Sequence, residues 1–291
     1  MRVYLKPFDA LGDTVCSSAV VLNMYDAGIK VNVHTYGIHD DLWSACPVLD
    51  KTITETSADC VVKQYKLDPM RDGSPSLIGW FTSTAARDLG IQIPVKYEKP
   101  VIWMQEEDPS PVHGAYVLIN TGYMDREPTK RWSNKYWTEL VKSTPDILFV
   151  QMGMSKNHAV PIPGAVSFID KTPTKKELFN LVRHAKCVIT HPSGVGHIAS
   201  AYGVPVILLV GAREPAELSS YPEFTTLSSV GCGLSCCAPG DRCFKHQFNH
   251  PRKDNCSHYT YLDKDVPTSD CMTRITPDMV SSELKKIFRF N

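Results

Sequence analysis

The sequence lacks any long hydrophobic run. None of its segments approaches the roughly 20 consecutive apolar residues that a membrane-spanning helix needs. The first seven residues, MRVYLKP, reach a proline before a signal-peptide core can form. We therefore expect a cytoplasmic protein with no transmembrane segment.

The sequence also lacks an excess of charge of either sign. It contains 31 Lys and Arg residues and 31 Asp and Glu residues, so its formal net charge is zero. Proteins that bind nucleic acid or anionic membranes over a broad surface carry a basic excess. The charge balance argues against such a surface along the whole chain and leaves only a local basic patch open.

Internal repeats and low-complexity tracts are absent too, and what is there is a regular alternation of strand-like and helix-like segments. The 291 residues suffice for about two domains. In the first part we predict strands at Arg2–Leu5, Lys30–Tyr36, Asp59–Tyr65 and Val101–Met104, and helices at Asp13–Ala27 and Ser76–Leu89. Such alternation predicts βαβ units and a parallel sheet.

An acidic, proline-rich segment, Gln105–Gly114, interrupts this pattern and is typical of an interdomain linker. The alternation then restarts and is lost after Pro215. We predict strands at Tyr116–Gly122, Asp146–Gly153, Ala165–Ile169, Cys187–Thr190 and Val204–Gly211, and helices at Ser133–Ser143, from Thr174 to about Ala185, at Ser193–Tyr202 and from Thr276–Pro277 onward. The sequence thus predicts an α/β protein with domains at 1–107 and 115–275 and a C-terminal helix at 276–291.

Ligands of parallel α/β sheets bind outside the carboxyl ends of the strands, and a cleft between domains is the usual site. Asp13 follows the first predicted strand, at the start of the first helix. It is either a helix cap or, facing the cleft, a general base. These roles combine poorly, because a capping hydrogen bond lowers the pKa of a carboxylate and weakens it as a base.

Two further loops carry residues suited to a phosphate. Thr121-Gly122 follows the first strand of the second domain and precedes the adjacent cations Lys130 and Arg131, which suit a diphosphate or form a solvated basic loop. The loop from His191 to His197 (HPSGVGH) combines a capping serine, Ser193, with glycines and a helix N-terminus that attracts an anion. His197 lies one turn into that helix and either lines a ligand site or packs in the core.

The pattern Gly194-x-Gly196-x-x-Ala199, with Glu214 twenty residues beyond Gly194, also fits a dinucleotide-binding fingerprint. An NAD(P)-dependent oxidoreductase is therefore a rival interpretation. The short helix and the late position of the motif weigh against it.

Cysteine is sparse over most of the chain and dense near its end. Six of the ten cysteines lie within 40 residues, and these are Cys232, Cys236, Cys237, Cys243, Cys256 and Cys271. In a chain long enough to have its own core, this favours a metal site over disulfides or free thiols. Four thiolates from Cys232, Cys236, Cys256 and Cys271 suit zinc or iron.

Other ligand sets stay open, because Cys237 and Cys243 form a second pair and a histidine (His246, His250 or His258) can replace a cysteine. A non-catalytic metal-finger module that binds nucleic acid or protein is a second rival. A two-Cys, two-His finger fits poorly, since only two residues separate Cys243 from His246 where about a dozen are expected.

Five motifs follow one another along the chain in a familiar order. They are Leu11-Gly12-Asp13, Lys130-Arg131-Trp132, Ser193-Gly194-x-x-His197-x-Ala199-x-Ala201-Tyr202-Gly203-x-Pro205, Gly211-x-x-x-Pro215 and Cys271-Met272-x-x-Ile275. With them the chain resembles glycosyltransferase family 9, the ADP-heptose:lipopolysaccharide heptosyltransferase-like group, almost from end to end. It departs from the family where Pro192 replaces an aspartate, and His191 is a candidate substitute for that contact.

The resemblance implies a GT-B fold, with two Rossmann-like domains facing across a cleft, the acceptor in the N-terminal domain and the donor in the C-terminal one. It implies inverting transfer of a heptose or related hexose from a nucleotide-diphosphate donor, an ADP-sugar by preference, without a metal at the catalytic centre. By motif match, Asp13 is the general base, Lys130 neutralises the leaving diphosphate, Ser193 and Gly194 bind it, and His197 lines the donor site.

Thr121 and His191 complete the expected donor-binding residues. The Cys-rich loop, residues 231–271, resembles the metal-finger loop of autotransporter heptosyltransferases in density, though not in spacing. The acceptor (a glycan, a protein or another hydroxyl compound) and self-association as a homo-oligomer are left open.

Overall fold

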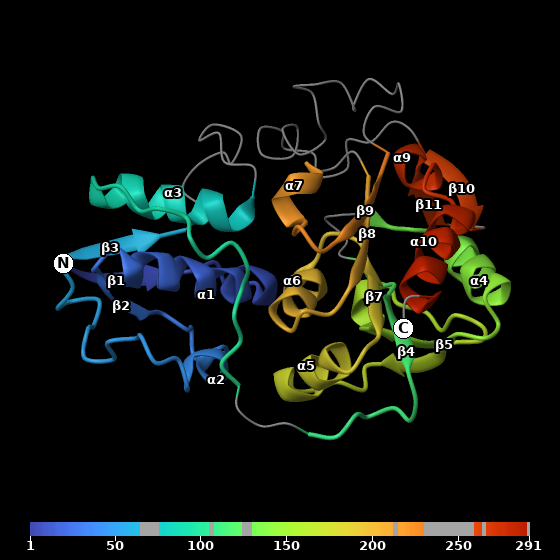
Figure 1. Ribbon diagram of the computed structural model, residues 1–291, viewed down its shortest axis with the longest axis horizontal. Coiled ribbons are helices and arrows are strands. Elements are labelled where there is room, and N and C mark those ends of the chain that lie inside the picture. The colour runs from blue at the N-terminus through green and yellow to red at the C-terminus, as the bar shows by residue number, and fades with distance from the viewer. Residues whose placement is uncertain are drawn as a thin grey trace.

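The computed structural model describes residues 1–64, 76–104, 108–123, 130–211, 215–229, 259–263 and 266–289. Two parallel sheets with their helices form two lobes that lie side by side (Figure 1). The predicted α/β class is confirmed. Within the described parts of the chain, no helix is long and apolar enough to cross a membrane.

The smaller sheet has three parallel strands in the order β2-β1-β3. Its strands are β1 (Arg2–Lys6), β2 (Lys30–Val33) and β3 (Cys60–Lys63). Helices α1 (Leu11–Asp26) and α3 (Leu77–Leu89) pack against each other and on strands β2 and β3, and the short helix α2 (Asp40–Trp43) follows β2. Helix α3 ends as its sequence predicts, since Gly90 takes the left-handed conformation that glycine favours.

The larger sheet has six parallel strands in the order β6-β5-β4-β7-β8-β9. They are β4 (Tyr116–Asn120), β5 (Leu148–Gly153), β6 (Val166–Ile169), β7 (Cys187–Thr190), β8 (Val206–Val210) and β9 (Thr225–Ser228). This is the doubly wound Rossmann order, in which the direction of winding reverses between the first and fourth strands. The carboxyl ends of β4 and β7 therefore flank the crevice where such sheets bind ligands.

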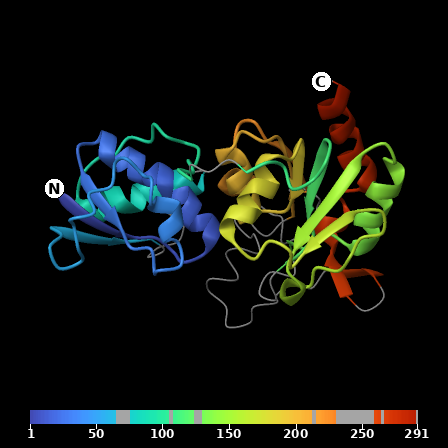
Figure 2. The same ribbon diagram turned by 90° about the horizontal axis from the view of Figure 1, so that it is seen from below.

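Both faces of the larger sheet are covered by helices. Helices α5 (Lys175–Arg183) and α6 (Gly194–Ala201) lie on the face toward the smaller lobe, whereas α4 (Asn134–Ser143) and α10 (Pro277–Arg289) cover the outer face (Figure 2). Alternate residues of β4 pack in different hydrophobic clusters on the two faces of the sheet. Leu118 belongs to the cluster that includes residues of α6, and Val117 belongs to the cluster that includes residues of α4 and α10. Burial on both faces explains why β4 and β8 are apolar throughout.

The structure corrects one predicted strand. Val101–Met104 has no strand partner, because the connector binds side chains of α1 and not a sheet edge. The Val101 N–H donates to Ser18 Oγ at 2.8 Å, and Asn23 Oδ1 accepts from the Lys96 and Tyr97 N–H groups. The predicted linker Gln105–Gly114 is only partly described, since residues 105–107 lie outside the described ranges.

Helices and strands also occur where the alternating pattern of the sequence is weak. After Pro215 come the short helix α7 (Ala216–Ser219) and the edge strand β9, whose sequence TTLS is only half-buried. The chain closes with an antiparallel hairpin, β10 (Tyr259–Asp263) and β11 (Val266–Ser269), followed by helix α9 (Asp270–Thr273) and by α10, which packs on α4.

The two lobes meet where helix α1 contacts helix α6 (Figure 1). A Cβ atom on Gly12 would lie 2.7 Å from the Gly194 Cα atom, and one on Gly194 would lie 3.1 Å from the Gly12 nitrogen. The first distance is shorter than real Cβ atoms show, and the second is tighter than most of their contacts. The first turns of two helices from different sheets thus touch backbone to backbone.

We expect Gly12→Ala to destabilise the protein by roughly 1–3 kcal/mol, because the added methyl group meets backbone that no side-chain rotation can move. The control is Gly196→Ala in helix α6, where a Cβ atom would make only ordinary contacts at 3.7 Å. Helix propensity favours this alanine by roughly 0.5–1 kcal/mol. Denaturant unfolding measures both changes, and equal stability of Gly12→Ala and the native chain would contradict the prediction.

Candidate functional site

Side chains at the ends of β4 and β7 are joined by hydrogen bonds at the point where the winding reverses. Asn120 Nδ2 donates to Thr190 Oγ1 at 3.1 Å and to Ser193 Oγ at 3.2 Å, and the two hydroxyl oxygens lie 3.0 Å apart. Ser193 occupies the N-cap position of α6, but its side chain makes no capping hydrogen bond. The first turn of α6 therefore keeps amide N–H groups, with their partial positive charge, available to an anion.

Lys130, which lies shortly before helix α4, reaches the same loop. Its Nζ donates to the Pro192 carbonyl at 3.0 Å, which places the ammonium beside Ser193. The positive charge of Lys130 also acts on His197, one turn into α6. The structure thus brings Lys130, Ser193, Gly194 and His197 together, as the sequence predicts, although the chain positions span two loops.

Thr121 and His191 lie at the ends of the same two strands. The Thr121 hydroxyl accepts a hydrogen bond from Gln151 Nε2 at 2.7 Å, so the hydroxyl hydrogen itself can be donated to a ligand. His191 is buried, and its carbonyl accepts from the Thr190 hydroxyl at 2.9 Å. Both residues lie at the carboxyl edge of the larger sheet.

Asp13 is carried to this region by helix α1. The helix begins at Leu11 with Ala10 as its N-cap residue, so the interpretation of Asp13 as the capping residue is wrong. Asp13 is partly buried in the first turn and directly follows Gly12, the residue that touches Gly194. A carboxylate is favoured there by the helix dipole.

The two adjacent cations of the Lys-Arg-Trp motif have different surroundings. Arg131 is buried, donates to Thr268 Oγ1 at 2.9 Å and pairs with the Asp263 carboxylate. Asp263 also accepts the N–H groups of Asn134 and Lys135, which begin helix α4. Arg131 therefore joins the hairpin to α4, which corrects the expectation that it faces a phosphate; for Lys130 that role stays a prediction.

The C-terminal motif packs against the end of β8. A Cβ atom on Gly211 would lie 2.8 Å from Met272 Sδ and 3.0 Å from Cys271 Sγ. The buried Trp132 side chain donates its Nε1–H to the Ile275 carbonyl at 2.7 Å. Three of the five motifs thus fit one another in the core.

Of the four proposed metal ligands only Cys271 is described; Cys232, Cys236 and Cys256 lie outside the described residues, as do Cys237, Cys243, His246, His250 and His258. Cys271 is buried, and its thiol donates to Ser269 Oγ at 3.3 Å. No group of three His, Cys, Asp or Glu side chains in the described ranges is placed to hold a metal ion. The ligand role of Cys271 stays a prediction.

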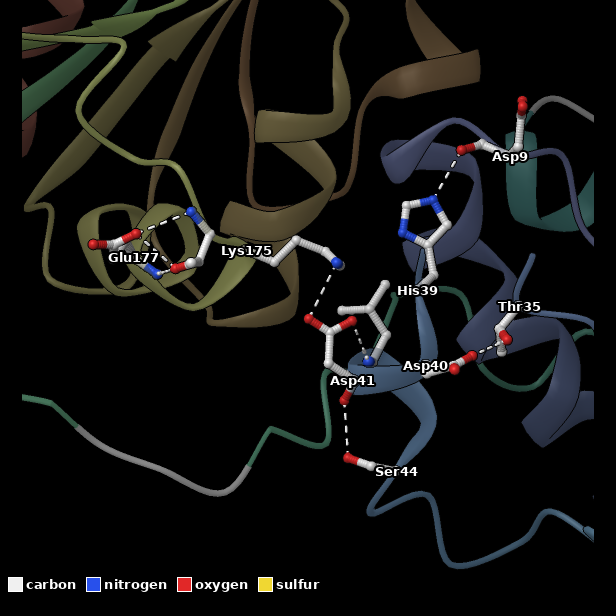
Figure 3. A network of polar contacts seen from close by, with 10 residues as sticks. Asp9, Thr35, His39, Asp40, Asp41, Ser44, Lys175 and Glu177 are labelled. Carbon is white, nitrogen blue, oxygen red and sulfur yellow. Dashed lines mark hydrogen bonds and ion pairs between the residues drawn. The ribbon is translucent and has the colours of Figure 1, made fainter. Parts of the chain in front are cut away.

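Sequence reasoning missed the contacts that fix the loops of the smaller sheet. Lys175, the first residue of α5, pairs with Asp41 of α2 at 3.1 Å (Figure 3). In the same view, His39 Nε2 bonds the Asp9 carbonyl at 2.8 Å. The loops after β1 and β2 are thus joined to each other and to the larger lobe beside the start of α1. The one feature of the sequence that could have indicated these contacts is a basic residue, Lys175, at the start of a predicted helix.

The fold and this arrangement define a class of protein with two parallel α/β lobes and a candidate ligand site at the switch point of the larger sheet. Residues 173–238 match the model of glycosyltransferase family 9 (heptosyltransferase), which confirms the resemblance predicted from the sequence. No curated protein matches the chain.

Solved structures agree with the fold. The chain is similar to Escherichia coli ADP-heptose lipopolysaccharide heptosyltransferase II, with 15% identity, coverage of 99% of this chain and 98% of that one, and a TM-score of 0.62. It is similar to TibC, an iron-containing dodecameric glycosyltransferase of enterotoxigenic E. coli, with 18% identity, coverage of 99% and 78%, and a TM-score of 0.67. A family 9 glycosyltransferase of Veillonella parvula gives 12% identity, coverage of 100% and 97%, and a TM-score of 0.65.

These matches support a glycosyltransferase that uses a nucleotide-sugar donor, and they support neither rival. The Gly194-x-Gly196 turn follows β7 and not β4, the first strand of the larger sheet, where a dinucleotide fingerprint belongs. Glu214 lies outside the described residues. A stand-alone metal-finger module does not account for two α/β lobes.

His197 gives the site a measurable pH dependence. Burial, with the nearby positive charge of Lys130, lowers its pKa from 6.5 to about 4. The unfolded chain therefore takes up a proton near pH 6.5, whereas the folded one does so only near pH 4. Stability from this residue is complete above pH 6.5 and falls as the pH decreases toward 4.

We therefore expect the native protein to lose about 2 kcal/mol more unfolding free energy between pH 7 and pH 5 than His197→Gln does. Urea unfolding of both proteins at the two pH values gives this difference, from which the contributions of the other titrating groups cancel. The same loss in both proteins would refute the assignment.

Proposed function

We propose that the protein is an inverting glycosyltransferase that moves a heptose or related hexose from a nucleotide-diphosphate donor to an acceptor hydroxyl. One observation carries the proposal: Gly12, the residue before Asp13, touches Gly194 at the N-terminus of α6, and the loop before that helix holds the Lys130 ammonium. Sugar transfer needs a base for the nucleophile and positive charge for the leaving group.

In this reaction Asp13 takes the proton from the acceptor hydroxyl. The acceptor oxygen then attacks the anomeric carbon from the face opposite the diphosphate, and the bond from that carbon to the diphosphate oxygen breaks. Negative charge develops on the departing nucleotide diphosphate. Lys130, the Ser193 hydroxyl and the amide of Gly194 would stabilise it, with Thr121, His191 and His197 as further donor contacts, so that no metal ion is needed at the reacting atoms.

The donor is assigned to the larger lobe, residues 115–275, and the acceptor to residues 1–107, with the C-terminal helix at 276–291 supporting the donor side. An ADP-sugar is the favoured donor, because TibC has been solved in complex with ADP-D-β-D-heptose. The acceptor is a glycan, a protein or another hydroxyl compound. The cytoplasm is the proposed location.

We expect Asp13→Asn to lower kcat by about 10²- to 10⁴-fold with donor binding retained, because the amide cannot accept the proton. Lys130→Met should instead weaken donor binding, and the control Lys135→Met removes an exposed lysine of α4. A screen of ADP-, UDP- and GDP-sugars by calorimetry, followed by transfer assays, measures these effects. Full activity of Asp13→Asn would rule out the assigned base.

We also propose that Cys232, Cys236, Cys256 and Cys271 hold a structural zinc or iron ion. The density of cysteines supports this, and TibC contains iron. Cys271 is buried, and the alternative ligands are Cys237, Cys243 or one of the histidines His246, His250 and His258. TibC is also dodecameric, so homo-oligomerisation belongs to the proposal.

We expect about one zinc or iron ion per chain by elemental analysis, and we expect Cys232→Ser with Cys236→Ser to abolish it, since thiolates are the ligands both metals accept. Cys60→Ser, in strand β3 of the smaller sheet, is the matched control and should retain the metal. Purified native protein with neither metal would overturn this part of the proposal.

A further inference from the structure

A buried chain of three polar side chains crosses the contact between the lobes. Tyr221, which lies between α7 and β9, places its hydroxyl 2.8 Å from His197 Nδ1 and 3.6 Å from Cys16 Sγ. Cys16 belongs to α1 and His197 to α6, so the chain joins the two helices one turn beyond the Gly12–Gly194 contact. The three residues are at most 8% exposed.

The hydrogen-bond directions in this chain follow from its chemistry. Burial raises the pKa of Tyr221 and of Cys16, so both keep their protons, while the low pKa of His197 keeps its ring neutral. A thiol sulfur is a weak acceptor and an imidazole nitrogen a good one. The Tyr221 O–H therefore donates to His197 Nδ1, and the Cys16 S–H donates to the Tyr221 oxygen.

A neutral imidazole that accepts at Nδ1 carries its hydrogen on Nε2. The ring carbon bonded to Nε2, Cδ2, lies 3.2 Å from the position that a Cβ atom on Gly12 would take. The Cδ2 side of the ring, to which Nε2 is bonded, thus faces Gly12 in the first turn of α1, the residue before Asp13. Since the ring is held only through Nδ1 by residues in the described ranges, the Nε2–H is left for a ligand oxygen.

We propose that Tyr221 is a positioning residue that holds His197 as the Nε2–H tautomer, so that the ring donates a hydrogen bond to an oxygen of the bound nucleotide sugar. The use of that hydrogen bond rests on the proposed glycosyltransferase function, whereas the tautomer does not. A reversed tautomer would present a lone pair to that oxygen. The contact would be repulsive for a phosphate oxygen, and a sugar hydroxyl could make it only by donating its own hydrogen.

The tautomer is measured without any substrate. In protein labelled with ¹⁵N-histidine, two-bond ¹H–¹⁵N correlation spectra at pH 7 distinguish the two neutral tautomers, and the spectrum of His197→Gln assigns the signals. We expect the Nε2–H form in the native chain and a shift toward Nδ1–H in Tyr221→Phe. Tyr202→Phe, at the C-terminal end of the same helix, is the control and should leave the tautomer unchanged.

An Nδ1–H tautomer in the native chain, or an unchanged tautomer in Tyr221→Phe, overturns the proposal. Cys16→Ser provides a second variant, in which a serine hydroxyl still donates to the Tyr221 oxygen, and we expect it to retain the Nε2–H form. Loss of the Nε2–H form in Cys16→Ser would contradict the proposed chain of hydrogen bonds, and this variant can be measured even if Tyr221→Phe is destabilised.

Transfer kinetics test the use of the hydrogen bond separately. We expect Tyr221→Phe to lower kcat/KM for the donor by about tenfold, the effect of one lost hydrogen bond. The double variant with His197→Gln should be no slower than His197→Gln alone. Additive losses would overturn the coupling, whereas absence of transfer in the native protein, with the predicted tautomer present, would count against the proposed function alone.

Discussion

The backbone contact between Gly12 and Gly194 is the constraint on which the site depends. It brings together the N-termini of two helices that belong to different sheets. Two helix N-termini in contact concentrate partial positive charge, which is unfavourable unless an anion is near. Asp13 supplies one negative charge from the protein itself. A diphosphate would supply more, so the geometry that costs energy in the free protein is the one that would favour the binding of the proposed donor.

The cations Lys130 and Arg131 are adjacent in the sequence but have different surroundings. Arg131 is part of the packing of the fold, and Lys130 lies at the candidate site. The guanidinium of Arg131 offers several fixed donors, and these suit a buried partner set of a carboxylate and a hydroxyl. The ammonium of Lys130 is a point charge on a flexible stem, and it reaches a loop edge where a phosphate can approach. Exchanging the two residues would leave a buried carboxylate poorly paired and would remove the flexible charge from the site.

The sequence predicts most strands and helices because their signals are local. The capping box at Thr174 and Glu177 forms as expected, and the apolar runs of β4 and β8 lie in a sheet covered on both faces. Val101–Met104 fails, although it is apolar, because side chains of α1 take up the backbone hydrogen bonds of the connector. The role of Asp13 as a cap fails because the helix starts earlier, at Leu11. Tyr221 could not be found from sequence, since its partners lie 24 and 205 residues away.

The replacement of the family aspartate by Pro192 now has a physical consequence. A carboxylate at this position would add a negative charge close to Lys130, whose ammonium bonds the carbonyl of the same residue. The proline carbonyl accepts a hydrogen bond from Lys130 but carries no net charge, so this contact leaves the ammonium positive. In the proposed function, the site would therefore hold a diphosphate more by charge and less by a carboxylate that contacts the sugar. Discrimination among donor sugars would then fall to other groups, and His197 in the proposed Nε2–H form would be suited to bind a sugar hydroxyl.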